Sequence, residues 1–242
     1  MVYLYGNHAC LAALANPDRV IEEVWCTESM AQKIDSLGLA ARKGTRRRHV
    51  VDKRALDALV DGPHQGVVVK AQPLQTDPID ILHDTDARIV VVLDQVTDPQ
   101  NVGSILRLCR VFGVGALVTT HAHSPKETGT MAKIASGALE VIPRCVVSNL
   151  AEGIRSLKSF GFWCLGLAEG APQSICEVDL SGKIALIMGS EGAGMRKLTK
   201  DLCDFNAYIP SSPEFSTLNV TMATAVSLYE VFCAEGKPTR QK

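Results

Sequence analysis

The feature that most constrains the fold of this chain is a run of six residues, IVVVLD at positions 89–94, which is apolar up to its final Asp. A strand with one face in water alternates polar and apolar residues, whereas an uninterrupted apolar run is typical of a strand buried on both faces of a parallel sheet. A second such run, KIALIMG, occupies positions 183–189. The two runs therefore predict a parallel sheet that is covered by helices on both faces.

Other strand-like and helix-like segments alternate between and after these runs. We expect strands at 115–120, 144–147, 162–168 and 206–210, and helices at 101–112, 130–139, 150–160 and 196–203. This alternation indicates an α/β domain, in which ligands bind beyond the carboxyl ends of the strands.

A smaller α/β pattern precedes this domain. We expect helices at 7–14, 31–42 and 54–60, and strands at 20–26, 47–51 and 66–72. Pro73 and the polar segment after it predict a linker. The sequence thus predicts an N-terminal domain at 1–74, a linker at 75–87 and a main domain at 88–242.

The charge of the chain is unevenly distributed. Its net charge is −1, which argues against a protein coated in nucleic acid. Residues 42–54, however, contain seven basic residues against the single acid Asp52; the seven are Arg42, Lys43, Arg46, Arg47, Arg48, Lys53 and Arg54. Such a basic block fits a phosphate backbone, and charge alone fits a solvated helix end and turn equally well.

The composition favours a cytoplasmic protein without a metal site or a membrane span. The eight cysteines form no CxxC pair and no Cys–His metal spacing, so we expect small core residues in a reducing compartment. No apolar run approaches the ~20 residues of a membrane span, and the N-terminus lacks a basic region followed by an apolar one.

Polar side chains follow the first apolar strand. Asp98 and Pro99 start a helix that carries Asn101 and Arg107, which are six residues apart. Both can address one region only if the loop bends, because six residues span nearly two helical turns. Arg107 is either a surface charge on an amphipathic helix, which the periodicity favours, or a buried guanidinium with an anionic partner.

A glycine-rich loop, SEGAGMRKL, follows the second apolar strand and lets the backbone approach a ligand closely. Its glycines do not match the GxGxxG dinucleotide fingerprint. Ser190 is not a hydrolase nucleophile, because all six histidines precede it and that class needs its His after the Ser. Glu191 is left as a lone carboxylate, either a helix N-terminal acid or a catalytic group.

The third strand end leads into IPSSPEFSTLNVTMATAVSLYE at 209–230. Ser216 and Thr217 are good N-cap residues, so we expect a helix after them with Asn219 in its first turn. From Leu218 to Tyr229 this helix carries no charge, and it is therefore expected to be buried on more than one side. A buried amide needs partners, so a polar group should meet Asn219 there.

Taken together, DPQNVGSILRLCRVFGV, LIMGSEGAGM and IPSSPEFSTLNVTMATAVSLYE resemble, in order and spacing, the three motifs of the SpoU (TrmH) family. The segment KETGTMAKIASGALE, with Lys133, Ser136 and Gly137, is similar to the family's segment between the first two motifs. GNHACLAAL and HQGVVV resemble the start and end of the small N-terminal substrate-binding domain of many members. The resemblance covers nearly the whole chain, and its motif set is highly specific.

This resemblance implies an RNA ribose 2′-O-methyltransferase of the SPOUT superfamily. It implies a trefoil knot at the C-terminal end of the main domain, and a homodimer whose interface includes the last helix. It also implies the cofactor S-adenosylmethionine, held by backbone groups of Gly189, Ile209 and Leu218. The N-terminal domain resembles ribosomal-protein-like RNA binders of the L30e/L7Ae kind.

The resemblance also places Asn101, Arg107, Glu191 and Asn219 at the reaction centre. Arg107 is the candidate base; since a guanidinium is normally locked in its charged form, its other possible role is to orient the ribose hydroxyl. Asn101 and Glu191 are expected to fix Arg107 and the loop, and Asn219 to join the knot to the site. Thr217 and Thr221 stand where many members have Ser, and the loop SSPEFS lacks a Gly that is common there.

A guanosine of 23S rRNA is the favoured substrate by this analogy, and tRNA is the alternative. We expect RNA contacts from the basic block, in particular from Arg42, Arg46, Arg47 and Arg48. Two rival functions are a SPOUT enzyme that methylates a base and a non-catalytic RNA-binding or assembly protein. The retention of all four polar residues argues against the second rival.

Overall fold

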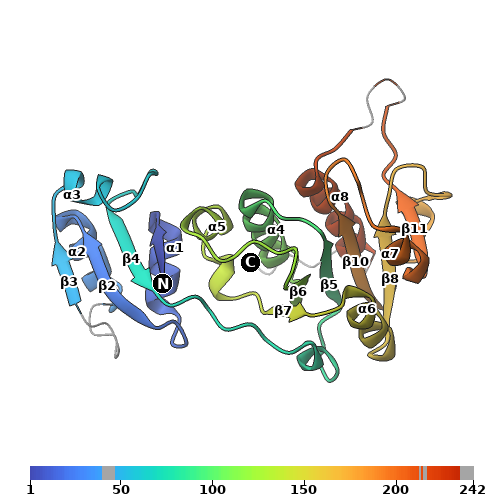
Figure 1. The fold of residues 1–242 in the computed structure, drawn as a ribbon, viewed down its shortest axis with the longest axis horizontal. Helices are drawn as coiled ribbons and strands as arrows, with labels where there is room; N and C mark the ends of the chain where they lie inside the picture. The colour runs from blue at the N-terminus through green and yellow to red at the C-terminus, as the bar shows by residue number, and fades with distance from the viewer. Residues whose placement is uncertain (40–46, 213, 215–216, 235–242) are drawn as a thin grey trace. The chain divides into compact units, whose positions relative to one another are not determined.

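The computed structural model describes residues 1–39, 47–212, 214 and 217–234. The chain forms two units (Figure 1). Unit 1 consists of Met1–Gln75, Val102–Arg107 and Lys126–Val141, and unit 2 consists of Thr76–Asn101, Leu108–Pro125 and Ile142–Lys242. Two segments that the sequence assigned to the main domain, 102–107 and 126–141, thus belong to the unit that holds the N-terminal residues.

Unit 1 contains a four-stranded sheet in the order β1-β4-β2-β3. Its strands are β1 (Val2–Tyr5), β2 (Ile21–Cys26), β3 (Arg47–Val50) and β4 (Val67–Ala71). Strand β4 pairs antiparallel with β1 and β2, while β2 and β3 run parallel. One face carries fully buried residues such as Leu4 and Val69. The sequence predicted three of these strands and missed β1.

The inclusion of 126–141 in unit 1 follows from close packing of α5 (Gly129–Ala135) against β1. A Cβ atom at Gly129 would collide with the Tyr3 carbonyl oxygen, so only glycine allows this approach. Arg19 links the N-terminal residues to the same segment, because its buried guanidinium forms ion pairs at 2.5 Å with both Glu127 and Glu140. Removing either carboxylate would leave a poorly compensated buried charge.

The helices of unit 1 correct one predicted boundary. Helix α1 (Asn7–Ala15) and α3 (Lys53–Asp57) lie where helices were expected, although α3 ends earlier. Helix α2 spans Glu28–Ser36, so the prediction of 31–42 began too late. An acid in the first turn favours the earlier start, and Gly38, in the left-handed region with φ 70°, follows the end of the helix. Residues 40–42 of the prediction lie outside the described part.

Unit 2 contains a seven-stranded sheet in the order β7-β6-β5-β10-β8-β11-β9, and every neighbouring pair is parallel. The strands are β5 (Ile89–Asp94), β6 (Ala116–Thr120), β7 (Arg144–Val147), β8 (Phe162–Leu167), β9 (Gln173–Ser174), β10 (Lys183–Gly189) and β11 (Phe205–Tyr208). The two apolar runs of the sequence are β5 and β10, which lie side by side. The predicted parallel sheet is confirmed.

Helices flank this sheet. They are α4 (Pro99–Val111), which runs across both units, α6 (Leu150–Ser159), α7 (Lys197–Leu202) and α8 (Val220–Cys233). Ile154 and Leu157 of α6 are buried in one cluster with Val92 and Ile187 of the central strands. Helix α8 packs against β10.

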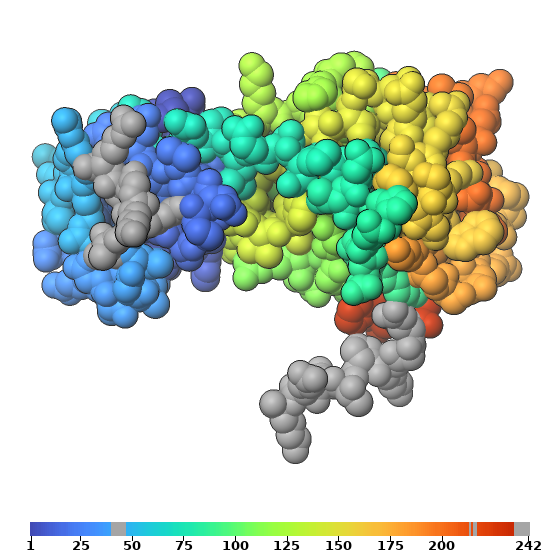
Figure 2. Space-filling view, turned by 90° about the horizontal axis from the view of Figure 1, so that it is seen from below, coloured from blue at the N-terminus to red at the C-terminus, as the bar shows by residue number. Residues whose placement is uncertain are grey.

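Residues 76–87, most of the predicted linker, pack on unit 2. They contain the 3-10 helix η1 (Ile79–Leu82), and the Asp77 amide donates to the Arg144 carbonyl at 2.9 Å, next to β7. Leu82 is buried, and the ring of His83 packs edge-on against Phe160. In Figure 2 the blue-green segment lies on the surface beside the yellow residues of α6.

The predicted helix at 130–139 is interrupted. Helix α5 ends at Ala135, and the 3-10 helix η2 (Ala138–Glu140) follows. Between them Ser136 and Gly137 have φ values of 51° and 89°, in the left-handed region that ends helices. Gly137 is the sequence signal for this break, because glycine enters the left-handed region without steric cost.

Candidate active site

A cleft of about 790 Å³ lies among the segments that follow β8, β10 and β11 at their carboxyl ends. Its walls come from the segments after these strands and from the start of α8; they include Leu167–Ala171, Met188–Gly194, Tyr208–Ile209, Ser211, Thr217–Val220 and Ala223. A volume of this size falls in the range of roughly 300–1,000 Å³ for small-molecule sites. The cleft lies at the edge of the sheet where parallel-sheet topology predicts ligand binding.

The glycine-rich loop after β10 folds back onto the strand that precedes it. Ser190 and Gly194 exchange backbone hydrogen bonds of 3.2 and 2.9 Å. A Cβ atom at Gly189 would collide with the backbone of Gly194 and Met195. Gly192 and Gly194 have φ values of 80° and 66°, which L side chains rarely adopt. This part of the cleft wall is therefore built largely of backbone.

A buried carboxylate that the sequence interpretation missed holds the end of this loop. Asp94, the last residue of β5, is fully buried and accepts two hydrogen bonds from Arg196, from the backbone N–H at 2.9 Å and from Nε at 2.8 Å. The signal was present, because an Asp closes an otherwise apolar strand. A carboxylate in that position needs charged or N–H partners.

Two of the predicted reaction-centre residues meet directly. Asn101 Nδ2 donates to Glu191 Oε1 at 3.0 Å, which links the start of α4 to the glycine-rich loop. Thr221 Oγ1, in the first turn of α8, donates to Asn101 Oδ1 at 3.2 Å. The sequence analysis gave Thr221 no role at the site, whereas its hydroxyl completes a chain of three side chains from three segments. Glu191 lines the cleft.

Asn219 also lines the cleft, but it lies before the first turn of α8 and not within that turn, as was expected. Helix α8 begins at Val220, and Asn219 is its N-cap, with Oδ1 accepting from the Met222 amide at 2.8 Å. Ser216 lies outside the described residues, and Thr217 precedes the helix. Asn219 is exposed in this chain, so the prediction of a buried amide in the first turn was wrong.

Arg107 stands apart from these contacts. It is exposed on α4, as the periodicity favoured, and within the described part of the chain it has no hydrogen-bond or ion-pair partner. Asn101 and Arg107 lie within one continuous helix, about 9 Å apart along its axis and about 120° apart around it. Within a single chain, the bend that would let both address one region is therefore absent.

All three predicted cofactor residues, Gly189, Ile209 and Leu218, line the cleft. They come from two of the three motif segments, Gly189 from LIMGSEGAGM and both Ile209 and Leu218 from IPSSPEFSTLNVTMATAVSLYE. The backbone polar groups at Gly189 can bind the polar edges of a ligand, and the apolar side chains of Ile209 and Leu218 can pack against a flat apolar part of it. The residues present therefore fit a nucleoside-type cofactor.

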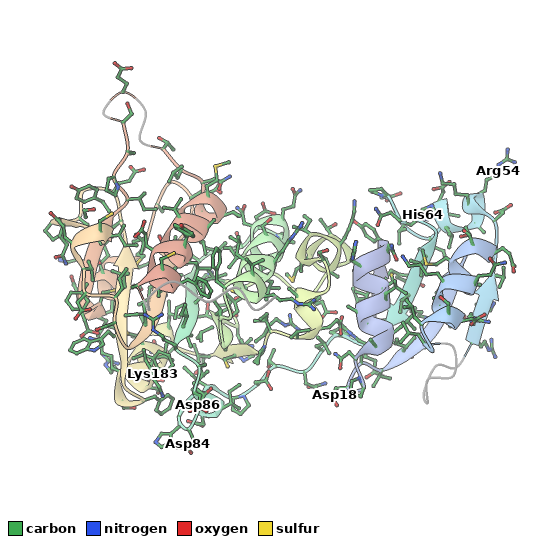
Figure 3. The ribbon with its side chains drawn as sticks, turned by 180° about the vertical axis from the view of Figure 1, so that it is seen from behind. Asp18, Arg54, His64, Asp84, Asp86 and Lys183 are labelled. Atoms are coloured by element: carbon green, nitrogen blue, oxygen red, sulfur yellow. The ribbon has the colours of Figure 1, made fainter. Side chains whose placement is uncertain are left out.

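The predicted RNA-binding residues fall into two groups. Arg42 and Arg46 lie outside the described residues. Arg47 and Arg48 are adjacent on β3 and therefore point to opposite faces of the sheet. Arg48 pairs with Asp35 of α2 at 2.5 Å, and Arg47 is exposed. Arg54, also in the basic block, is exposed at the far end of the view in Figure 3.

The cysteines do not supply a reactive group to the cleft. As expected, Cys10, Cys26, Cys109, Cys145 and Cys164 are buried, and all eight cysteines are free thiols. Burial raises the pKa of Cys145, Cys164 and Cys203 to about 12, which keeps these thiols protonated at neutral pH. Cys176 and Cys233 are exposed, which corrects the expectation of core positions for those two.

Two kinds of site are absent from the described part of the chain. In it, no group of three or more His, Cys, Asp or Glu side chains could hold a metal ion. Within the same residues, no helix has the length and apolar character needed to cross a membrane.

The fold and the cleft define an α/β protein with a small-molecule site in the loops after parallel strands. Residues 88–229 match the model of the SpoU rRNA Methylase family, and residues 3–77 match the model described as RNA 2'-O ribose methyltransferase substrate binding. The chain belongs to the SpoU rRNA Methylase family.

Relatives and solved structures agree with this assignment. The chain is 36% identical over 233 residues to the 23S rRNA (guanosine-2'-O-)-methyltransferase RlmB of Pseudomonas putida, covering 94% of each chain. It is 37% identical to the RlmB of Ralstonia nicotianae, covering 94% of this chain and 93% of that one. The SpoU methyltransferase AviRb of Streptomyces viridochromogenes, at 20% identity, has the same fold, with a TM-score of 0.80 over 96% of this chain and 88% of AviRb. AviRb has also been solved with AdoMet.

Proposed function

We propose that this protein transfers a methyl group from S-adenosylmethionine to the ribose 2′-hydroxyl of a guanosine in 23S rRNA. The observation that carries the proposal is the cleft at the ends of β8, β10 and β11. Backbone atoms of Gly189 form part of the cleft wall, and Glu191 lines the cleft as well. The carboxylate of Glu191 accepts a hydrogen bond from the amide of Asn101. The relatives named as 23S rRNA guanosine methyltransferases match 94% of this chain, which supports that substrate.

The cofactor, when bound, supplies an electrophilic methyl group on a sulfonium; the chain's own residues must position the ribose and handle its proton. In our proposal Gly189, Ile209 and Leu218 hold the cofactor. Glu191 and Thr221 fix the amide of Asn101 from two sides, so that the loop and α4 keep one geometry.

Arg107 is proposed to orient the ribose hydroxyl while its proton leaves. A guanidinium stays charged in proteins, so Arg107 can donate hydrogen bonds to the hydroxyl but has no free lone pair with which to accept its proton. Its exposure leaves all of its N–H groups available to RNA. Asn219 is proposed to contribute through the position it gives to the start of α8 at the cleft wall.

We further propose that the segment after β10 forms a trefoil knot and that two chains associate through α8. The insertion of β10 between β5 and β8 supports the first. An exposed apolar row on α8 (Met222, Val226 and Tyr229) supports the second. Residues 1–74 are proposed to form an RNA-binding domain of the L30e kind, joined by 75–87 to the catalytic domain at 88–242, in a protein of the cytoplasm.

Methyl transfer to purified RNA tests the function. The full chain is incubated with S-adenosylmethionine and unmodified 23S rRNA or tRNA, and the RNA is digested to nucleosides for mass spectrometry. We expect 2′-O-methylguanosine from 23S rRNA and about 100-fold less product from Arg107→Ala. Methylated product from tRNA alone would contradict 23S rRNA as the substrate. A methylated base would contradict the ribose as the methylated group. No product together with no cofactor binding by calorimetry would favour a non-catalytic RNA-binding protein.

A further inference from the structure

One face of the four-stranded sheet in unit 1 carries a row of three rings, Tyr3, Trp25 and His49, here called the ring row. Paired residues share a face of a sheet, and Trp25 is opposite both Val68 and His49, while Tyr3 is opposite Lys70. The ring centroids of Tyr3 and Trp25 are 6.2 Å apart. Those of Trp25 and His49 are 5.5 Å apart, with the planes within 16° of parallel.

The two outer rings of the ring row are open to solvent, and Trp25 between them is partly buried. Tyr3 is 37% exposed, and the side chain of His49 is also 37% exposed. The apolar core of the unit lies on the opposite face, where Leu4 and Val69 are fully buried. Strand β3 is an edge strand, so among the described residues the sheet adds no further side chain beyond His49. The stack therefore ends in a ring at the margin of the sheet.

Arg47, a cation that forms no ion pair among the described residues, accompanies the ring row, and Glu23 is its cross-strand neighbour. Arg47 lies two residues before His49 on β3 and thus on the same face. The acids of this region are engaged, because Glu22 and Glu23 pair with Lys70 at 3.5 and 3.6 Å, and Glu23 also contacts His49. Among the described residues Arg47 has no carboxylate partner, whereas Arg48, on the other face, pairs with Asp35.

We propose that the ring row binds unpaired nucleobases of RNA, with a base extending the stack at His49 and Arg47 binding the adjoining phosphate. This inference rests on the proposed function, and it names the surface that takes single-stranded parts of the substrate. Every base has a flat π face, so aromatic rows bind single strands with little sequence preference. The bases of a duplex are already stacked and cannot add to the row.

The two tryptophans of the chain, Trp25 and Trp163, allow a direct optical test. In the Trp163→Phe variant, Trp25 is the only tryptophan. We expect an RNA oligonucleotide of uridines to quench its fluorescence in a saturable way, and an abasic oligonucleotide of the same length to leave it unchanged. The Trp25→Phe variant, which reports on Trp163 in unit 2, should show no quenching.

Binding measurements on variants test the energetics. We expect Tyr3→Ala and His49→Ala each to weaken binding of the uridine oligonucleotide by about 5- to 100-fold, and His49→Phe to retain it. Trp163→Ala, which removes a 53% exposed tryptophan elsewhere, should have no effect. Arg47→Ala should lower the slope of affinity against salt by about one, and Arg155→Ala, at an exposed position on α6, should not. Circular dichroism establishes that each variant is folded.

Unchanged affinity in folded Tyr3→Ala and His49→Ala, or equal affinity for the abasic strand, would overturn the ring row as a base-binding site. Methyl transfer by the wild-type chain is measured in parallel. If it persists while these variants bind normally, the inference fails and the proposed function stands. If the wild-type chain binds the oligonucleotide through the ring row but methylates no RNA, the proposed function fails and the inference stands.

Discussion

At the scale of single residues, the cleft depends on polar contacts between segments that are far apart in the sequence. Asn101 donates to Glu191 and accepts from Thr221, and Asp94 accepts twice from Arg196. Hydrogen bonds to charged groups contribute about 1.5–3 kcal/mol each, so these contacts can hold a glycine-rich loop in one conformation. Their loss should therefore affect the loop before it affects the sheet.

Substitution of Asn101 separates these effects. We expect Asn101→Ala to lower kcat/KM for methyl transfer by about 100-fold, because small displacements at a reaction centre have effects of that size. Thermal unfolding should shift by only a few degrees, since the side chain is partly exposed. Gln100→Ala, an exposed neighbour on the same helix, is the control. Activity of Asn101→Ala within twofold of wild type would contradict a role for this amide.

Which residues meet was only partly predictable from the sequence. Motif resemblance brought Asn101 and Glu191 together, and the structure places them in contact. The roles of Thr221 and Asp94 were not predictable, because a hydroxyl in a helix or an Asp at a strand end is common in any protein. Their partners are 120 and 102 residues away in the chain, and only folding selects them.

At the scale of elements, the sequence predicted the strands better than the helix ends. Strands 89–94, 144–147 and 183–189 were predicted to the residue, because apolar runs stop sharply at polar or glycine residues. The start of α8 was misplaced, since Ser216, Thr217 and Asn219 are all good N-caps within four residues. Local preference cannot choose between them; the contact of Thr221 with Asn101 favours the last.

Asn219 has two possible roles that a pair of substitutions distinguishes. Asn219→Ala removes the N-cap and should lower the free energy of unfolding by about 1 kcal/mol, measured with urea. Asn219→Asp keeps the cap and should leave stability within about 0.5 kcal/mol. If the side chain serves the site only through the cap, Asn219→Asp keeps its activity. A stable Asn219→Asp variant with methyl transfer reduced tenfold or more would instead indicate a direct contact with cofactor or RNA.

At the scale of the whole molecule, α8 has one face against β10 and an apolar face in solvent. Met222, Val226 and Tyr229 are 56, 40 and 58% exposed and follow a helical spacing. The sequence predicted burial of α8 on more than one side, but within one chain only the face against β10 is buried. A second copy of the chain is the occupant that we propose for the other side, and the cleft borders the same helix.

Charge on this face should separate the copies. In size-exclusion chromatography with light scattering we expect the wild type to elute as a dimer and the double variant Met222→Glu, Tyr229→Glu to elute as a monomer, because burial of unpaired carboxylates in an interface is costly. Leu198→Glu on α7, a position that is 58% exposed, is the matched control and should remain a dimer. A dimeric double variant, or a monomeric wild type, would contradict association through α8.

The pairing of β5 with β10 also has a consequence in time. Ile89 of β5 aligns with Ile184 of β10, which lies 95 residues later in the chain. The centre of the sheet therefore cannot form until the ribosome has synthesised those residues. At roughly 5–20 residues per second, a ribosome needs on the order of 5–20 s for that stretch. During this interval β5, the most apolar segment of the nascent chain, lacks its final neighbour. Newly made chains are thus most exposed to aggregation, and to capture by chaperones, just before residue 189 emerges.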